Sequence, residues 1–184
     1  MNFKLMLALP ILCVAGCASL PPFNFSVPDV AASSRKVDAN LKSVTVTIAS
    51  PKDKTGRIDP GTSLITTMWK DSLQDVLDRS AVFQDNSLNS VSLDVKILQV
   101  DIPGAGITFT THVDARYDII NRTSGAVVFS KTIPSEGTVP LGYAALGLTR
   151  QRESINRAIQ SNIATFLQSL ESSGIDAALF RASP

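Results

Sequence analysis

Residues 90–133 read SVSLDVKILQVDIPGAGITFTTHVDARYDIINRTSGAVVFSKTI and contain three runs in which apolar and polar residues alternate. This period of two is typical of strands that bury one face. In the clearest run, 107–119, Tyr117 and its apolar neighbours share one face, and His112 and its polar neighbours share the other. Two short segments rich in turn residues, PGAG and NRTSG, separate the runs. We therefore predict strands over 90–102, 107–120 and 126–133, joined as an antiparallel meander.

The first of these strands changes phase in its middle. Its apolar residues occupy odd positions up to Ile97 and even positions from Leu98 onward. One extra residue in a strand moves every later side chain to the opposite face, which is the effect of a β-bulge. The sequence therefore predicts a bulge near Ile97-Leu98.

Two helical patterns flank the meander, and a further short strand is predicted over 42–48. Residues 62–80 and 150–172 carry apolar residues at spacings of three and four, which is typical of helices with one buried side. The two apolar sets are Ile65, Trp69, Leu73, Val76 and Leu77, and Ile155, Ile159, Ile163, Phe166, Leu167 and Leu170. The order β-α-β-β-β-α predicts an α+β two-layer sandwich, with a mainly antiparallel sheet and both helices on one face.

Residues 134–148 are predicted to form a long connection, because they hold three glycines and two prolines among apolar residues. Four of the apolar residues are candidates for contact with a partner: Val139, Leu141, Tyr143 and Leu146. Exposed apolar loops commonly mark contact with protein or lipid. The alternative is that the loop folds down as a lid over one end of the core.

The chain offers little catalytic or metal chemistry. His112 is its single histidine and falls in the middle of a predicted strand, where an exposed histidine is the simpler interpretation. A Ser-His-Asp arrangement with Asp114 would need a serine brought to the imidazole by the fold. One histidine and two cysteines provide no spaced pair of metal ligands. We therefore expect no catalytic residue, no metal and no cofactor.

The first twenty residues, MNFKLMLALPILCVAGCASL, resemble the export signal of a bacterial lipoprotein. Lys4 precedes a short apolar stretch, and the sequence VAGC at 14–17 is similar to a lipobox, which implies acylation of Cys17 and cleavage before it. The apolar stretch is shorter than the roughly 20 residues that a transmembrane helix needs. Loss of 1–16 removes Lys4, so 16 of the 17 basic residues remain against 16 acidic ones. This balance argues against nucleic-acid binding.

The expected organisation therefore has four parts. Residues 1–16 form the signal peptide, and 17–42 form a lipidated N-terminus and tether rich in proline and serine. A single periplasmic domain spans 43–172, and 173–184 form a C-terminal tail that begins near a helix-ending Gly174. The alternation of Phe23, Phe25 and Val27 leaves open a short strand docked on the domain.

Several motifs together resemble the ABC-type transport auxiliary lipoproteins and other small periplasmic lipoproteins of Gram-negative bacteria. They are Cys17, Ser80–Phe83, Tyr117–Ile120, Gly125–Phe129 and Asn162–Leu167. The resemblance implies a non-enzymatic accessory protein of a lipid-transport or other envelope complex, with a palmitate-type lipid anchor and envelope protein partners such as a transporter. Ala18 follows the cysteine, and in this position the chain is similar to lipoproteins sent to the outer membrane. There the domain would face the periplasm. Two alternatives stay open: a homo-oligomeric ring subunit of a secretion or polysaccharide-export assembly, and an envelope enzyme.

Overall fold

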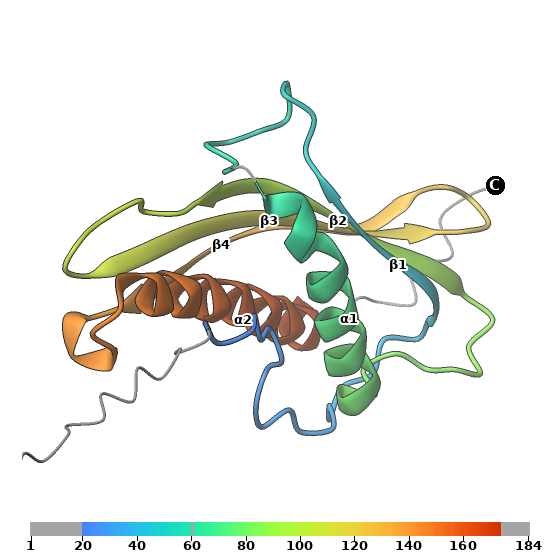
Figure 1. Cartoon of the computed structure of the whole chain (residues 1–184). Coiled ribbons are helices and arrows are strands. Elements are labelled where there is room, and N and C mark those ends of the chain that lie inside the picture. Colours follow the sequence, from blue (N-terminus) through green and yellow to red (C-terminus); the bar gives the residue numbers. More distant parts are fainter. Residues whose placement is uncertain (1–19, 60, 174–184) are drawn as a thin grey trace, which may run out of the picture.

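The computed structural model describes residues 20–59 and 61–173 (Figure 1). Their helices and strands follow one another as β1 (Asn40–Ile48), α1 (Thr62–Ser80), β2 (Ser90–Asp101), β3 (Phe109–Asn121), β4 (Val127–Val139), the short 3-10 helix η1 (Leu141–Tyr143) and α2 (Gly147–Ser173). The predicted order β-α-β-β-β-α is confirmed.

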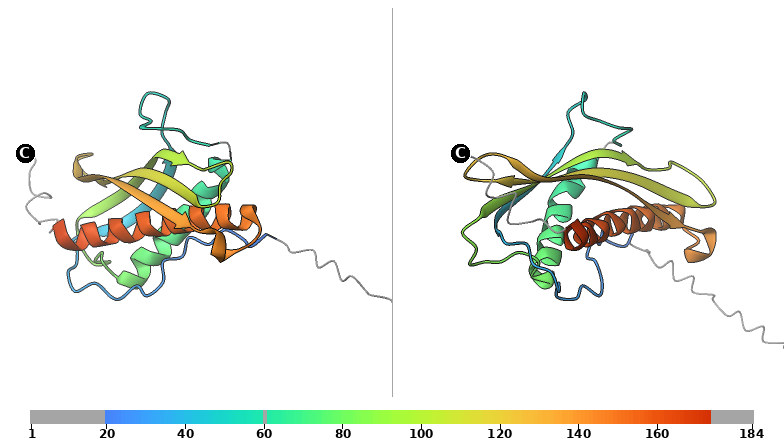
Figure 2. Two further views of the ribbon diagram at one scale, coloured as in Figure 1. Left: turned by 90° about the vertical axis from the view of Figure 1, so that its left-hand side faces the viewer. Right: turned by 180° about the vertical axis from the view of Figure 1, so that it is seen from behind.

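The four strands form one mixed sheet in the order β1-β2-β3-β4. β1 runs parallel to β2, and the pairs β2–β3 and β3–β4 are antiparallel. A parallel pair needs a long crossover, which α1 provides. Both helices lie on the same face of the sheet, α1 across β1 and α2 along β3 and β4 (Figures 1 and 2). The predicted α+β sandwich is therefore confirmed.

The predicted bulge is also present. The pairing of β2 with β3 shifts between Ile97 and Gln99, so that Leu98 is the extra residue. Ile97 and Val100 consequently lie opposite Ala115 and Val113 on the same buried face.

The core fills the space between this face and the two helices. Trp69 and Leu73 of α1 and Ile159 and Ile163 of α2 have no exposed surface. Both helical stripes expected from the sequence therefore face the sheet. The ring of Tyr117 in β3 stacks on Phe166 of α2 with 4.1 Å between centroids, which is closer than the roughly 4.5–7 Å usual for aromatic pairs.

The predicted connection over 134–148 is wrong in its first part, because β4 continues to Val139. Proline and glycine argued against a strand there, but β4 is an edge strand, where a proline needs no partner for its missing N–H. Gly137 is required by packing: a Cβ at this position would collide with the Ser154 carbonyl oxygen and the Ala158 backbone nitrogen of α2. The absence of a side chain lets α2 lie directly on the strand.

Two further differences from the predicted boundaries concern the starts of α2 and β3. α2 begins at Gly147, three residues before the predicted start. β3 begins at Phe109, which leaves Ile107 outside the sheet with 73% of its surface exposed. Ile107 therefore does not belong to the buried face on which the alternation placed it.

The expected free tether is wrong from Phe23 onward. Phe25 and Ala39 are fully buried or nearly so, at 1% and 0% exposure, and Val37 pairs with Phe83 after α1. The segment crosses beneath both helices on the side away from the sheet (Figure 1). It is an integral part of the core and forms no strand of its own before β1.

Other expectations lie outside the described residues: the signal peptide, Cys17, Gly174 and all but the first residue of the tail. Among the described helices, none combines the length and the apolar character that a membrane crossing requires.

Candidate contact surface

The connection between β4 and α2 exposes its apolar side chains. Leu141, Tyr143, Leu146 and Leu148 are each about half exposed, between 48% and 55%. They do not cover the core, so the lid alternative does not describe them. Val139 differs: it ends β4, faces the core with 0% exposure and therefore leaves the candidate set.

Arg150 holds this connection in place from the first turns of α2. Its guanidinium donates hydrogen bonds to the carbonyl oxygens of Ala144 at 2.5 Å and Ala145 at 3.0 Å, and lies 5.3 Å from the centroid of the Phe109 ring. The side chain is almost wholly buried. The exposed leucines are therefore carried by a braced loop, and their outward position is part of the fold.

The turn between β2 and β3 is fastened to the same helix end. Gln151 donates a hydrogen bond to the Pro103 carbonyl oxygen at 2.7 Å, and Arg150 reaches the Gly106 carbonyl oxygen at 3.5 Å. This brings the exposed Ile107 to the same end of the molecule as the β4–α2 connection. We call Ile107, Leu141, Tyr143, Leu146 and Leu148 together the apolar end surface.

The N-terminal segment joins the domain beside this surface. Arg152 donates a hydrogen bond to the Pro21 carbonyl oxygen at 2.7 Å and lies 4.6 Å from the centroid of the Phe23 ring. One turn further along α2, Asn156 accepts a hydrogen bond from the Asn24 backbone N–H. The described chain therefore begins at the N-terminal end of α2, next to the η1 turn (Figure 2).

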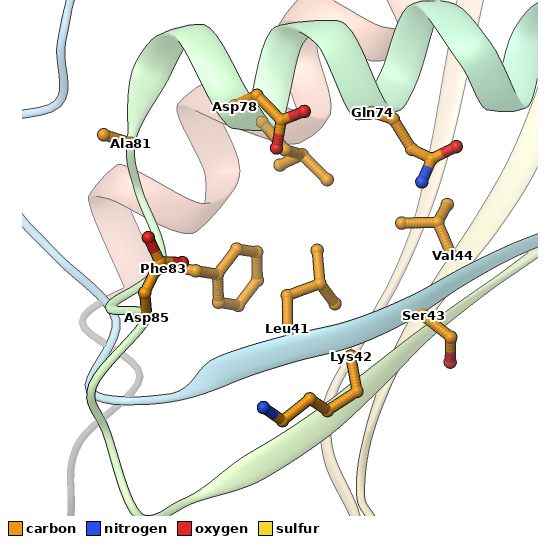
Figure 3. Close-up of a pocket in the computed structure, with 10 residues that line it drawn as sticks. Leu41, Lys42, Ser43, Val44, Gln74, Asp78, Ala81, Phe83 and Asp85 are labelled. Atoms are coloured by element: carbon orange, nitrogen blue, oxygen red, sulfur yellow. The ribbon is translucent and has the colours of Figure 1, made fainter.

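A groove lies at the opposite end of the sheet, between the start of β1 and the C-terminal half of α1 (Figure 3). Its volume is about 290 Å³. Leu41, Val44 and Phe83 supply apolar lining, and Lys42, Asp78 and Asp85 supply charges of both signs. The lining holds no histidine or cysteine, so it offers no nucleophile paired with an imidazole.

His112 lies on the open face of the sheet, as the alternation predicted. Its Nδ1 is 3.8 Å from Glu136 Oε2, and about half of its side chain is exposed. The neighbouring Ser135 hydroxyl points to the other face, where it donates to the Ala158 carbonyl oxygen at 3.0 Å. The described contacts of His112 include no serine hydroxyl. The described residues also contain no group of three or more His, Cys, Asp or Glu side chains able to hold a metal ion.

A buried polar cluster links the sheet to α2, and the sequence patterns did not reveal it. The Tyr117 hydroxyl donates to Asn162 Oδ1 at 2.7 Å, and the Asn162 amide donates to the Ile133 carbonyl oxygen at 2.8 Å and to Ser135 Oγ at 3.0 Å. Burial raises the pKa of the Tyr117 hydroxyl above its usual range, and the neighbouring Trp69 acts weakly in the opposite direction. The Trp69 indole N–H is buried without a well-formed hydrogen bond among the described residues.

No family model matches the sequence, and no curated protein matches it either. Several solved structures are similar to the chain. A Xanthomonas campestris protein of the family DUF330 aligns with a TM-score of 0.54 at 13% identity, over 79% of this chain and 90% of that one. A minor lipoprotein from Acinetobacter baumannii reaches a TM-score of 0.45 at 11% identity, over 74% of this chain and 93% of that one.

A dodecamer of PelC from Paraburkholderia phytofirmans gives a TM-score of 0.42 at 16% identity, over 78% of this chain and 95% of that one. The TM-score of 0.54 with the Xanthomonas campestris protein shows a common fold, and at 13% identity it shows the fold alone. The function of this chain has to be argued from its own residues.

Proposed function

We propose that this protein is a lipid-anchored accessory lipoprotein of a Gram-negative cell-envelope complex, held at the periplasmic side of the outer membrane and without enzymatic activity. The observation that carries the proposal is the lipobox-like sequence VAGC ending at Cys17, only four residues before the described chain docks on α2 at Pro21. A signal for acylation placed directly before a folded domain suits a protein that works at a membrane surface.

The arrangement of polar residues supports a binding role. His112 and Glu136 are about half exposed or more and lie in a shallow depression of the open sheet face. Catalysis by an imidazole needs a nucleophile or substrate site within hydrogen-bond reach, held in place by its surroundings. The groove and the apolar end surface are better suited to contacts with other macromolecules. A lipid-transport or ABC-transport assembly is the complex that the sequence motifs favour.

Capture from native membranes tests this function. The protein with a C-terminal affinity tag is purified in mild detergent, its N-terminal peptide is analysed by mass spectrometry, and co-purifying proteins are identified. We expect a diacylated Cys17 at the mature N-terminus and enrichment of transporter or other envelope subunits. A chain that keeps residues 1–16, or an acylated chain that copurifies no envelope protein above an untagged control, would contradict the proposal.

The second candidate, a ring-forming subunit, is favoured by one observation. β1 is an edge strand, and no described residue pairs with its outer backbone edge. Open edges are templates for pairing with another chain. Light scattering in detergent distinguishes the candidates, because a ring subunit gives a homo-oligomer of fixed size and an accessory monomer does not. The Ala49 N–H bonds Ile97 of β2, so by the period of two the Val46 N–H faces the open edge. Replacing Val46 by proline should therefore dissolve such a ring.

A further inference from the structure

The apolar end surface exposes five apolar side chains at one end of an otherwise well-packed domain. Four of them, Ile107, Leu141, Tyr143 and Leu146, come from two connections that Arg150 and Gln151 fasten to α2, and Leu148 belongs to the first turn of that helix. Exposed apolar side chains gathered in one place mark an interaction site, and these are held outward by a buried arginine. The question is which partner covers them.

The length of chain before the domain limits the answer. Pro21 is the fourth residue after Cys17. A chain spans at most about 3.6 Å per residue, so Pro21 lies within about 14 Å of the acylated cysteine. The polar headgroup layer of a bilayer is roughly 5–8 Å thick on each side. An anchored Cys17 therefore keeps Pro21 at or just above the headgroups.

The apolar end surface lies directly beside this attachment point. Pro21 is bonded to Arg152, and Leu148 precedes Arg152 by four residues on α2. Side chains four residues apart are neighbours on a helix surface. The short chain therefore brings Leu148, and the braced connections around it, to the level of the lipid headgroups.

The composition of the surface fits a lipid interface. Tyr143 combines an apolar ring with a polar hydroxyl, and Arg157 packs over that ring at 5.2 Å. Tyrosine is enriched where membrane proteins meet water, and arginine extends its charge toward the headgroups from an apolar setting. Arg152 stands beside this end as a second cation, and Glu153 pairs with Arg157 at 2.8 Å.

We propose that the apolar end surface docks on the lipid bilayer, so that the leucines and Tyr143 enter the headgroup layer and fix the orientation of the anchored domain. The inference rests on the proposed acylation of Cys17. Its consequence is that the β1–α1 groove, at the other end of the sheet, points away from the membrane.

Depth-dependent quenching in vesicles tests the docking. After processing and acylation the chain has no free thiol, so an introduced cysteine can be labelled selectively. Gly142→Cys places an environment-sensitive fluorophore within the apolar end surface, where a Cβ meets nothing within 4 Å. Thr123→Cys places the same label in the exposed β3–β4 turn at the opposite end of the sheet. The full acylated protein is reconstituted into phosphatidylethanolamine–phosphatidylglycerol vesicles that contain brominated lipid.

We expect brominated lipid to quench the label at position 142 and to leave the label at position 123 unaffected. The pair Leu141→Ser and Leu148→Ser should lower the docking constant about tenfold, because the exposed halves of two leucines together account for roughly 1.4 kcal/mol or more. Leu88→Ser is the matched control, since Leu88 is 98% exposed in the loop before β2, at the opposite end.

Three results would overturn the docking. Equal quenching at both positions shows that the domain has no fixed orientation. If the label at position 142 reports an apolar environment that depends on protein concentration, and brominated lipid does not quench it, a second copy covers the surface. If the label reports an apolar environment in native membranes but not in vesicles without other proteins, a protein partner covers the surface. Absence of an acyl group on Cys17, measured beforehand on the same sample, overturns the proposed function as well and is recognised separately.

Discussion

At the scale of single residues, Gly137 sets how closely α2 approaches the sheet. A Cβ at this position would meet two backbone atoms of α2, and backbone cannot move aside as the end of a flexible side chain can. Gly137→Ala should therefore push the helix from β4 and lower the free energy of unfolding by about 1–3 kcal/mol, the usual cost of overpacking. Urea denaturation measures this change.

Gly142→Ala is the control for this substitution, because the same methyl group there meets nothing within 4 Å. Its urea midpoint should stay within error of the wild type. Similar midpoints for the two alanine variants would mean that α2 does not pack on β4 as closely as the structure indicates.

Tyr117 contributes stability that depends on pH. Tyr117→Phe removes the donor to Asn162 Oδ1 and leaves a buried acceptor without its partner, so at neutral pH it should cost about 1–3 kcal/mol. Burial raises the pKa of Tyr117 above the ordinary value of 10.0. The folded state then keeps its proton where the unfolded state loses it. The stabilisation by Tyr117 is therefore full below pH 10 and declines above it, by at most about 1.4 kcal/mol per pH unit.

The measurement is the difference in unfolding free energy between the wild type and Tyr117→Phe, at pH 8 and at pH 11. The difference should be smaller at pH 11. A constant difference would show that the hydroxyl ionises as readily in the folded protein as in the unfolded chain. Other groups that titrate in this range are common to both proteins and cancel.

At the scale of elements, the two helices are held by their apolar stripes. Ile159 on α2 has no exposed surface, so Ile159→Asp buries an unpaired carboxylate and should cost several kcal/mol out of a typical total of 5–15 kcal/mol. Asp75 on α1 is half exposed and pairs with Arg79, and Asp75→Ala should change stability by less than about 1 kcal/mol. Thermal denaturation compares the two, and equal melting temperatures would mean that the helix faces are assigned wrongly.

The regular elements could be predicted because their signals are local. The range of α1, Thr62–Ser80, agrees with its prediction, since its apolar stripe recurs at spacings of three and four from Ile65 to Leu77. The bulge at Leu98 also follows from local phase. The second half of β4 could not be predicted in this way, because Pro134 and Gly137 are typical of turns. They are tolerated there only because β4 is an edge strand and α2 crosses it closely.

The N-terminal segment was missed for a different reason. Residues 20–39 have no regular period, and their burial depends on contacts far along the chain, such as Val37 with Phe83 and Asn24 with Asn156. The candidate surface was predicted in part: Leu141, Tyr143 and Leu146 are exposed as expected, whereas Val139 is buried. Ile107 could not be added from sequence, since only the folded chain brings the β2–β3 turn beside α2.

Phe25 tests whether this segment belongs to the core. It is 1% exposed, so Phe25→Ala should lower the unfolding free energy by about 3–5 kcal/mol, the usual range for a buried phenylalanine. Ser26→Ala is the control, because Ser26 is the exposed neighbour of Phe25. A melting temperature unchanged by Phe25→Ala would restore the interpretation of a free tether.

At the scale of the whole molecule, the two ends of the sheet differ in chemistry. One end carries the entering chain and the apolar end surface, and the other carries the groove between β1 and α1 (Figures 2 and 3). Under the proposed function, an anchor at one end would leave the other end free for partners in the periplasm. The proposed accessory role would then divide into attachment at one end and recognition at the other.

The anchor itself is tested by Cys17→Ser. Removing the thiol prevents diacylglyceryl transfer, and cleavage before position 17 depends on that transfer, so the variant should accumulate with residues 1–16 attached and without acyl groups. The domain should still fold, since Cys17 precedes every residue of the described core, which begins at Phe25. If the variant is nevertheless cleaved, the released domain should partition into the aqueous phase. Each buried CH₂ of an acyl chain contributes about 0.8 kcal/mol to membrane binding, and a few half-exposed leucines cannot replace two such chains. Membrane fractionation, intact-mass measurement and thermal denaturation on one preparation separate these effects.

Normal processing with unchanged membrane partition would show that Cys17 is not the anchor. A lost melting transition would show that residues near the anchor contribute to the fold.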